Sequence, residues 1–285
     1  MKKIIVSLSL VLPLLLGACK NEVSPVDAAQ AAISLANTAY GSDPLQKADI
    51  YLPAGRDNDT KVIFMIHGGA WTTGDKADFY AFVDTLKKRL PSYAIVNINY
   101  RLASGSTNIF PTQENDVKAA VDFVYSKRSE YKISDKFVMM GASAGAQLAL
   151  LHAYKNTSPV KIKAVVDFFG PSDMVKMHNQ PAPLVPPSFI ASVMGGTPSQ
   201  VPAIYQQSSP VNFIEAQSAP TIILQGGLDP LVAPTQSEDV RNRLNQVGVN
   251  NQYVFYPMGG HGDWDVPTFT DAFNKIQAFL QANVQ

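Results

Sequence analysis

The sequence predicts a single α/β domain built on a mostly parallel central sheet flanked by helices. From about residue 45 onward, short apolar runs rich in β-branched residues alternate with segments whose apolar residues recur at helical spacing. This alternation is typical of a parallel sheet covered by helices. The chain has 285 residues, with 23 basic and 23 acidic side chains. Its length fits one large domain, and its balanced charge gives no indication of a nucleic-acid partner.

Apolar runs in order along the chain give the expected strands. They cover residues 48–52, 62–67, 94–100, 136–141, 164–169, 221–225 and 252–256. Helices are expected between the strands, and the clearest helical patterns cover 79–90, 115–131 and 269–280. In a sheet of this kind, loops at the carboxyl ends of the strands face a common crevice, which is where reactive groups are expected.

The first residues have the pattern of a secretory signal. Met1-Lys2-Lys3 is a charged start, an apolar stretch follows to Leu16, and small residues lead to Cys19. The apolar stretch is too short for a transmembrane helix. Leu16-Gly17-Ala18-Cys19 resembles the lipobox of bacterial lipoproteins, in which the cysteine becomes the lipidated first residue of the mature chain. An ordinary cleaved signal with a chance cysteine is the alternative.

The lipobox resemblance implies a signal peptide over 1–18, a lipidated tether over 19–35 and a catalytic domain over 36–285. It places the chain in the bacterial cell envelope, anchored to a membrane through Cys19, with the domain periplasmic or surface-exposed. Lys20 follows the cysteine, where an aspartate would favour the inner membrane, so the outer membrane is expected. Cys19 is the only cysteine, so the mature chain can form no internal disulfide.

Gly141-Ala142-Ser143-Ala144-Gly145 lies between an expected strand and a helical pattern. A serine hydroxyl is a weak nucleophile and needs space for a base and an incoming carbonyl group. A sharp strand-to-helix turn with small flanking residues provides that space, and this is the context of a nucleophile elbow. Ser143 is therefore the candidate nucleophile, and a serine in a plain glycine loop is the alternative.

A serine nucleophile requires a histidine base and an acid that orients it. The sequence has four histidines: His67, His152, His178 and His261. Both His67 and His261 follow expected strands, but the order serine, acid, histidine selects His261. Asp229 follows a strand between the two and is the candidate acid, with Asp173 as its competitor.

His67-Gly68-Gly69-Ala70-Trp71 follows another expected strand. Glycines at that point let backbone N–H groups turn toward a developing negative charge. The expected oxyanion donors are the N–H groups of Gly69 and Ala70, joined by that of Ala144. His67 is expected to fix the loop. Trp71 either lines the substrate pocket or anchors the loop.

The segment 171–214 interrupts the alternation with many prolines and scattered apolar residues. Loops of that length inside compact domains are usually functional. We expect it to form a cap over the site that includes short helices. A plain surface excursion is the alternative.

These motifs resemble the α/β-hydrolase fold, and more narrowly the carboxylesterases and lipases that carry His-Gly-Gly-x-Trp and are related to hormone-sensitive-lipase-like enzymes. Tyr100-Arg101-Leu102 supports the resemblance, which spans about 36–280. The chain departs from hormone-sensitive-lipase relatives at Ala142 and at Gly145-Ala146, where those enzymes commonly carry Asp and Gly-Gly. The departure points toward the polysaccharide-esterase and arylformamidase side of the group.

The resemblance implies a serine esterase that acts through an acyl-enzyme on Ser143, with Asp229 and His261 as partners and with no metal or organic cofactor. Its expected substrates are short-chain or sugar-linked acyl esters. An arylformamidase-like amide hydrolase is the alternative activity. A catalytically inactive surface binding module is the alternative from a different class.

Overall fold

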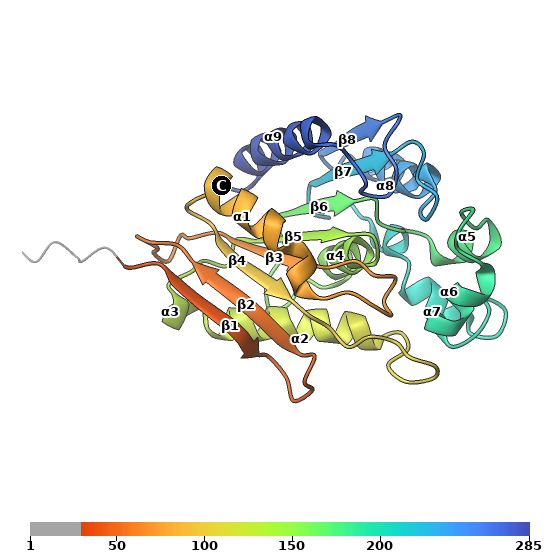
Figure 1. The fold of residues 1–285 in the computed structure, drawn as a ribbon, viewed down its shortest axis with the longest axis horizontal. Helices are drawn as coiled ribbons and strands as arrows, with labels where there is room; N and C mark the ends of the chain where they lie inside the picture. The colour runs from red at the N-terminus through yellow and green to blue at the C-terminus, as the bar shows by residue number, and fades with distance from the viewer. Residues whose placement is uncertain (1–29) are drawn as a thin grey trace, which may run out of the picture.

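The computed structural model describes residues 30–285 (Figure 1). The predicted signal peptide 1–18, Cys19 and most of the predicted tether lie outside the described residues, so the lipid anchor stays a prediction. Within 30–285, no helix has both the length and the apolar character needed to cross a bilayer.

The core of the fold is an eight-stranded sheet in the order β1-β2-β4-β3-β5-β6-β7-β8. β1 pairs with β2, and β2 with β4, in antiparallel fashion, and the other five pairs are parallel. The strands are β1 (Ile33–Ala39), β2 (Lys47–Leu52), β3 (Val62–Ile66), β4 (Ala94–Ile98), β5 (Phe137–Ala142), β6 (Ala164–Phe168), β7 (Thr221–Gly226) and β8 (Asn251–Tyr256).

All seven predicted strands are present, with ends within two residues of the prediction. β1 was not predicted, and it begins at Ile33, inside the segment 19–35 that the sequence assigns to a tether. This strand lies at the edge of the sheet and is exposed along most of its length. Of the residues of this strand, only Leu35 packs against the apolar core, so the strand carries no strong apolar alternation by which the sequence could reveal it.

Helices cover both faces of the sheet (Figure 1). α2, α4 and α8 contribute to one apolar cluster, whereas α1 and α9 contribute to the other. Alternate residues of β3 enter the two clusters, with Phe64 on one face and Met65 on the other. The elements outside the cap are η1 (Lys76–Phe79), α1 (Tyr80–Arg89), α2 (Thr112–Ser126), α3 (Arg128–Tyr131), α4 (Ala144–Lys155), α8 (Pro234–Gln246) and α9 (Val266–Asn283).

The segment 171–214 folds into short helices beyond the carboxyl ends of the parallel strands. These are α5 (Met174–Asn179), α6 (Pro187–Met194), α7 (Pro202–Gln207) and the 3-10 turn η2 (Pro210–Phe213). Figure 1 shows α5, α6 and α7 at the end of the molecule opposite the start of the described chain. Proline lies at the first or second position of α6, α7 and η2, where its missing N–H costs no helical hydrogen bond.

A fully buried carboxylate, Asp167, lies in the central strand β6. Its Oδ1 accepts a hydrogen bond of 2.8 Å from the Gly170 N–H. Its Oδ2 has no hydrogen-bond partner in the described part of the chain. Burial disfavours the charged form and raises the pKa of Asp167 to about 7.

We expect Asp167→Asn to stabilise the protein at pH 8 by clearly more than it does at pH 5. The folded-state pKa lies above the unfolded value, so the wild-type protein loses stability as the pH rises from about 4 to about 7. Asparagine carries no charge and avoids that loss, which is on the order of 2–4 kcal/mol. Urea unfolding of both proteins at pH 5 and pH 8 measures the difference. An equal gain at both pH values would contradict the expectation.

Candidate active site

Ser143 lies at the turn between β5 and α4, as the pentapeptide predicts. Its backbone has φ 55° and ψ −124°, a conformation that is strained for any residue with a Cβ. The turn is tight because glycines allow close approach. A Cβ on Gly141 would lie 2.3 Å from the Gly145 carbonyl oxygen, and one on Gly145 would lie 2.1 Å from that of Ile66. The side chain of Ser143 is thereby directed away from its own strand and helix.

His261 and Asp229 form a direct pair. His261 Nδ1 lies 2.7 Å from Asp229 Oδ2, and the side chains are 13% and 0% exposed. Because a carboxylate accepts hydrogen bonds, Nδ1 carries the proton and Nε2 is left as an acceptor. The second carboxylate oxygen, Oδ1, accepts from the N–H groups of Leu231 at 2.8 Å and Val232 at 2.9 Å. The acid is therefore held by the backbone that follows it.

His261 and Ser143 line the same cavity. Among the hydrogen bonds of residues 30–285, none joins the Ser143 hydroxyl to the imidazole. Serine and base frequently come within hydrogen-bonding distance only when substrate is bound, so a shared cavity wall is compatible with proton transfer.

The competing acid and the three other histidines of the sequence do not take part in this pair. Asp173 caps α5 by accepting from the Lys176 N–H. His152 is buried on α4, where burial lowers its pKa to about 4. His178 packs edge-on against Tyr205 of the cap. His67 is fully buried, and burial lowers its pKa, so its ring is neutral and belongs to the scaffold.

The loop after β3 has the backbone expected of an oxyanion site. Gly69, Ala70 and Trp71 all have positive φ, at 99°, 50° and 61°. Within residues 30–285, the N–H groups of Gly69 and Ala70 donate to no protein acceptor. In this same part of the chain the N–H of Ala144, the first residue of α4, also donates to no protein acceptor. Together they provide unpaired donors beside Ser143, and the helix dipole of α4 adds positive potential there.

Trp71 anchors the loop. Its side chain is 1% exposed, and its Nε1 donates to Gln147 Oε1 on α4 at 3.0 Å. Gln147 Nε2 in turn donates to the Ser208 carbonyl at the end of the cap. Trp71 is also one of the residues around the cavity, but its burial favours the anchoring role over direct substrate contact.

The cavity over Ser143 has a volume of about 440 Å³. The cap contributes Met177, Val185 and Phe189 to its lining, and η1, α1 and α9 contribute the phenylalanines Phe79, Phe82 and Phe269. Neither set was predicted as site residues. Phe79 and Phe82 belong to one helical pattern and Phe269 to another, and in a sequence such patterns cannot be distinguished from ordinary core packing.

A comparison with family models agrees with this architecture. The model described as BD-FAE matches residues 48–244, more than half of the 285 residues. The chain belongs to the BD-FAE family. The BD-FAE match includes Gly69, Ser143 and Asp229 but ends before His261, whose place in the site therefore rests on its contact with Asp229.

Similar proteins include several esterases. Over 207 residues the chain is 30% identical to "Probable carboxylic ester hydrolase LipM" of Mycobacterium tuberculosis, covering 68% of this chain and 47% of LipM. The chain spans about half the length of the relatives it matches.

Two solved structures are 27% identical to this BD-FAE member, each with a TM-score of 0.74 and 87% of this chain covered. One is a truncated carbohydrate esterase from gut microbiota, of which 96% is covered. The other is a bifunctional GH43-CE protein of Bacteroides eggerthii, of which 38% is covered. The molecule has the α/β-hydrolase fold.

Proposed function

We propose that this BD-FAE member is a serine-dependent carboxylic ester hydrolase. The observation that carries the proposal is the 2.7 Å contact between His261 Nδ1 and Asp229 Oδ2 in a cavity that Ser143 also lines. This contact leaves the Nε2 of the imidazole free to accept a proton, which a serine nucleophile requires.

In the proposed reaction, Ser143 Oγ attacks the ester carbonyl carbon while His261 Nε2 takes the hydroxyl proton. The oxyanion of the tetrahedral intermediate accepts hydrogen bonds from the N–H groups of Gly69, Ala70 and Ala144. His261 then gives its proton to the departing alkoxide, which leaves as an alcohol. Water, deprotonated by His261, attacks the acyl-enzyme, and the carboxylic acid is released as Ser143 recovers its proton.

The proposed substrates are short-chain or sugar-linked acyl esters. A cavity of about 440 Å³ lies near the lower end of the range for small-molecule sites and fits a short acyl group with part of its alcohol. The named carbohydrate esterase among the similar structures supports the sugar-linked class.

Hydrolysis of p-nitrophenyl esters from acetate to palmitate, by the wild-type protein and by Ser143→Ala, tests the proposal. We expect kcat/KM to be highest for the shortest chains and to fall with acyl length. We expect Ser143→Ala to lose activity by at least about 10⁴-fold, because no nucleophile remains. A fluorophosphonate probe should label the wild-type protein and leave the variant unlabelled.

Retained activity in a folded Ser143→Ala protein would overturn the mechanism. Equal activity on palmitate and acetate would overturn the short-chain preference. If no ester is cleaved but an N-formylated arylamine is, the amide-hydrolase alternative replaces the proposal.

A further inference from the structure

Two side chains converge on one carbonyl oxygen behind the proposed oxyanion donors. His67 Nδ1 lies 2.7 Å from the Gly68 carbonyl oxygen. The Tyr100 hydroxyl lies 3.2 Å from the same oxygen and 3.0 Å from the His67 carbonyl oxygen. A carbonyl oxygen only accepts, so the imidazole donates through Nδ1 and the hydroxyl donates to this pair of oxygens.

The Gly68 carbonyl and the Gly69 N–H belong to the same peptide group. In a planar trans peptide the C=O and N–H bonds point in opposite directions. Donors that fix the direction of the Gly68 C=O bond therefore also fix the direction of the Gly69 N–H bond, which points the opposite way. Gly69 is part of the cavity wall. Hydrogen bonds to the oxygen also polarise the peptide, which strengthens its N–H as a donor.

We propose that Tyr100 is a positioning residue of the oxyanion hole and that it acts through the Gly68–Gly69 peptide. The inference rests on the proposed function, because it assigns Tyr100 a part in stabilising the charge that ester attack creates. Tyr100 touches no substrate in this scheme. Its role is to fix the direction and strength of the Gly69 N–H before the reaction begins.

Tyr100 is suited to this role because it is rigidly held. It is 0% exposed, and its ring stacks on that of His67 with centroids 4.4 Å apart and planes 11° apart. Gly74 closes the other side of the same carbonyl, where a Cβ would lie 2.7 Å from the Gly68 oxygen.

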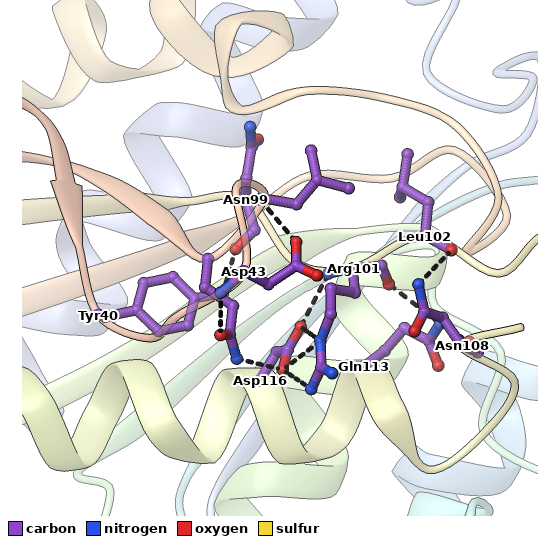
Figure 2. Close-up of polar contacts among 10 residues, drawn as sticks. Tyr40, Asp43, Asn99, Arg101, Leu102, Asn108, Gln113 and Asp116 are labelled. Atoms are coloured by element: carbon purple, nitrogen blue, oxygen red, sulfur yellow. Dashed lines mark hydrogen bonds and ion pairs between the residues drawn. The ribbon is translucent and has the colours of Figure 1, made fainter.

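Hydrogen bonds also hold both sequence neighbours of Tyr100, which are Asn99 and Arg101 (Figure 2). The carbonyl of Asn99 accepts a hydrogen bond from the Tyr40 hydroxyl. Arg101 donates to Asp116 through its backbone N–H at 2.8 Å and through its guanidinium at 2.6 Å. Asp116 is fully buried on α2, so it ties this segment to the body of the domain.

Tyr100→Phe is the variant that tests the proposal, because it keeps the buried ring and the stacking on His67 but removes the hydroxyl. We expect kcat on p-nitrophenyl acetate to fall about tenfold, a part of the 10²–10³-fold effect of losing a whole oxyanion donor. We expect KM to stay within about twofold, since the hydroxyl acts on the transition state. A boronic acid that forms a tetrahedral adduct with serine should bind about tenfold more weakly.

Tyr154→Phe is the matched control, because it also removes one buried tyrosine hydroxyl. That hydroxyl lies 2.6 Å from Thr221 Oγ1 and makes no contact with the Gly68–Gly69 peptide. We expect this variant to keep wild-type kcat. Asp116→Asn, which weakens the hold on Arg101, should lower kcat in the same direction as Tyr100→Phe but by less.

A folded Tyr100→Phe protein with wild-type kcat and wild-type boronic acid affinity would overturn the positioning role. So would an equal loss of kcat in Tyr154→Phe. These outcomes leave the proposed function intact as long as Ser143→Ala is inactive. An active Ser143→Ala protein would instead remove the proposed function itself.

Discussion

Replacing Asp229 by asparagine is expected to lower kcat by about 10⁴-fold while the protein stays folded. The backbone N–H groups of Leu231 and Val232 both donate to Oδ1, so they will hold the amide oxygen in that position. The amide NH₂ then faces His261 and donates to Nδ1. This forces the ring proton onto Nε2, where it blocks proton transfer from Ser143.

Steady-state kinetics on p-nitrophenyl acetate, with circular dichroism to confirm folding, measure this effect. Asp173→Asn is the matched control because Asp173 was the competing acid in the sequence. It caps α5, and asparagine is an equally good cap. We expect this variant to keep activity within about twofold. Full activity in Asp229→Asn, or a large loss in Asp173→Asn, would contradict the assignment of the acid.

Gly145→Ala is expected to destabilise the fold by more than about 4 kcal/mol, or to prevent folding. A Cβ at this position would lie 2.1 Å from the carbonyl oxygen of Ile66 and 2.3 Å from that of His67. Both atoms belong to the backbone at the end of β3. A side-chain rearrangement therefore cannot relieve the clash, and α4 must move off the sheet.

Gly105→Ala provides the comparison. Gly105 has φ 57°, and an added Cβ would meet nothing within 4 Å. Only the backbone preference changes, which costs about 1–2 kcal/mol. Urea unfolding followed by tryptophan fluorescence reports both variants. If Gly145→Ala proved as stable as Gly105→Ala, the close contact between elbow and sheet would not be as described.

The central sheet and the elbow could be predicted because their signals are local. Most residues of the buried parallel strands are apolar, and the residues flanking Ser143 must be small for strand and helix to meet. The contact between Asp229 and His261 was predicted from chain order and from the position of each residue after a strand.

The features that were missed depend on contacts distant in sequence. A helix was expected between β7 and β8, but its bounds could not be given, because α8 carries only Val240 and Leu244 as buried apolar side chains among many polar residues. The phenylalanines around the cavity have the spacing of core residues. Whether they pack inward or line a cavity depends on how α1 and α9 approach the cap, which residue spacing does not encode.

The backbone conformation of Ser143 lowers the stability of the fold at the residue proposed as the nucleophile. A positive φ at a non-glycine residue costs about 1–3 kcal/mol, which glycine at the same position would avoid. A lineage that no longer needed the reaction could therefore gain stability by a single change from serine to glycine. Under the proposed mechanism, the need for a nucleophile accounts for a serine rather than a glycine at position 143.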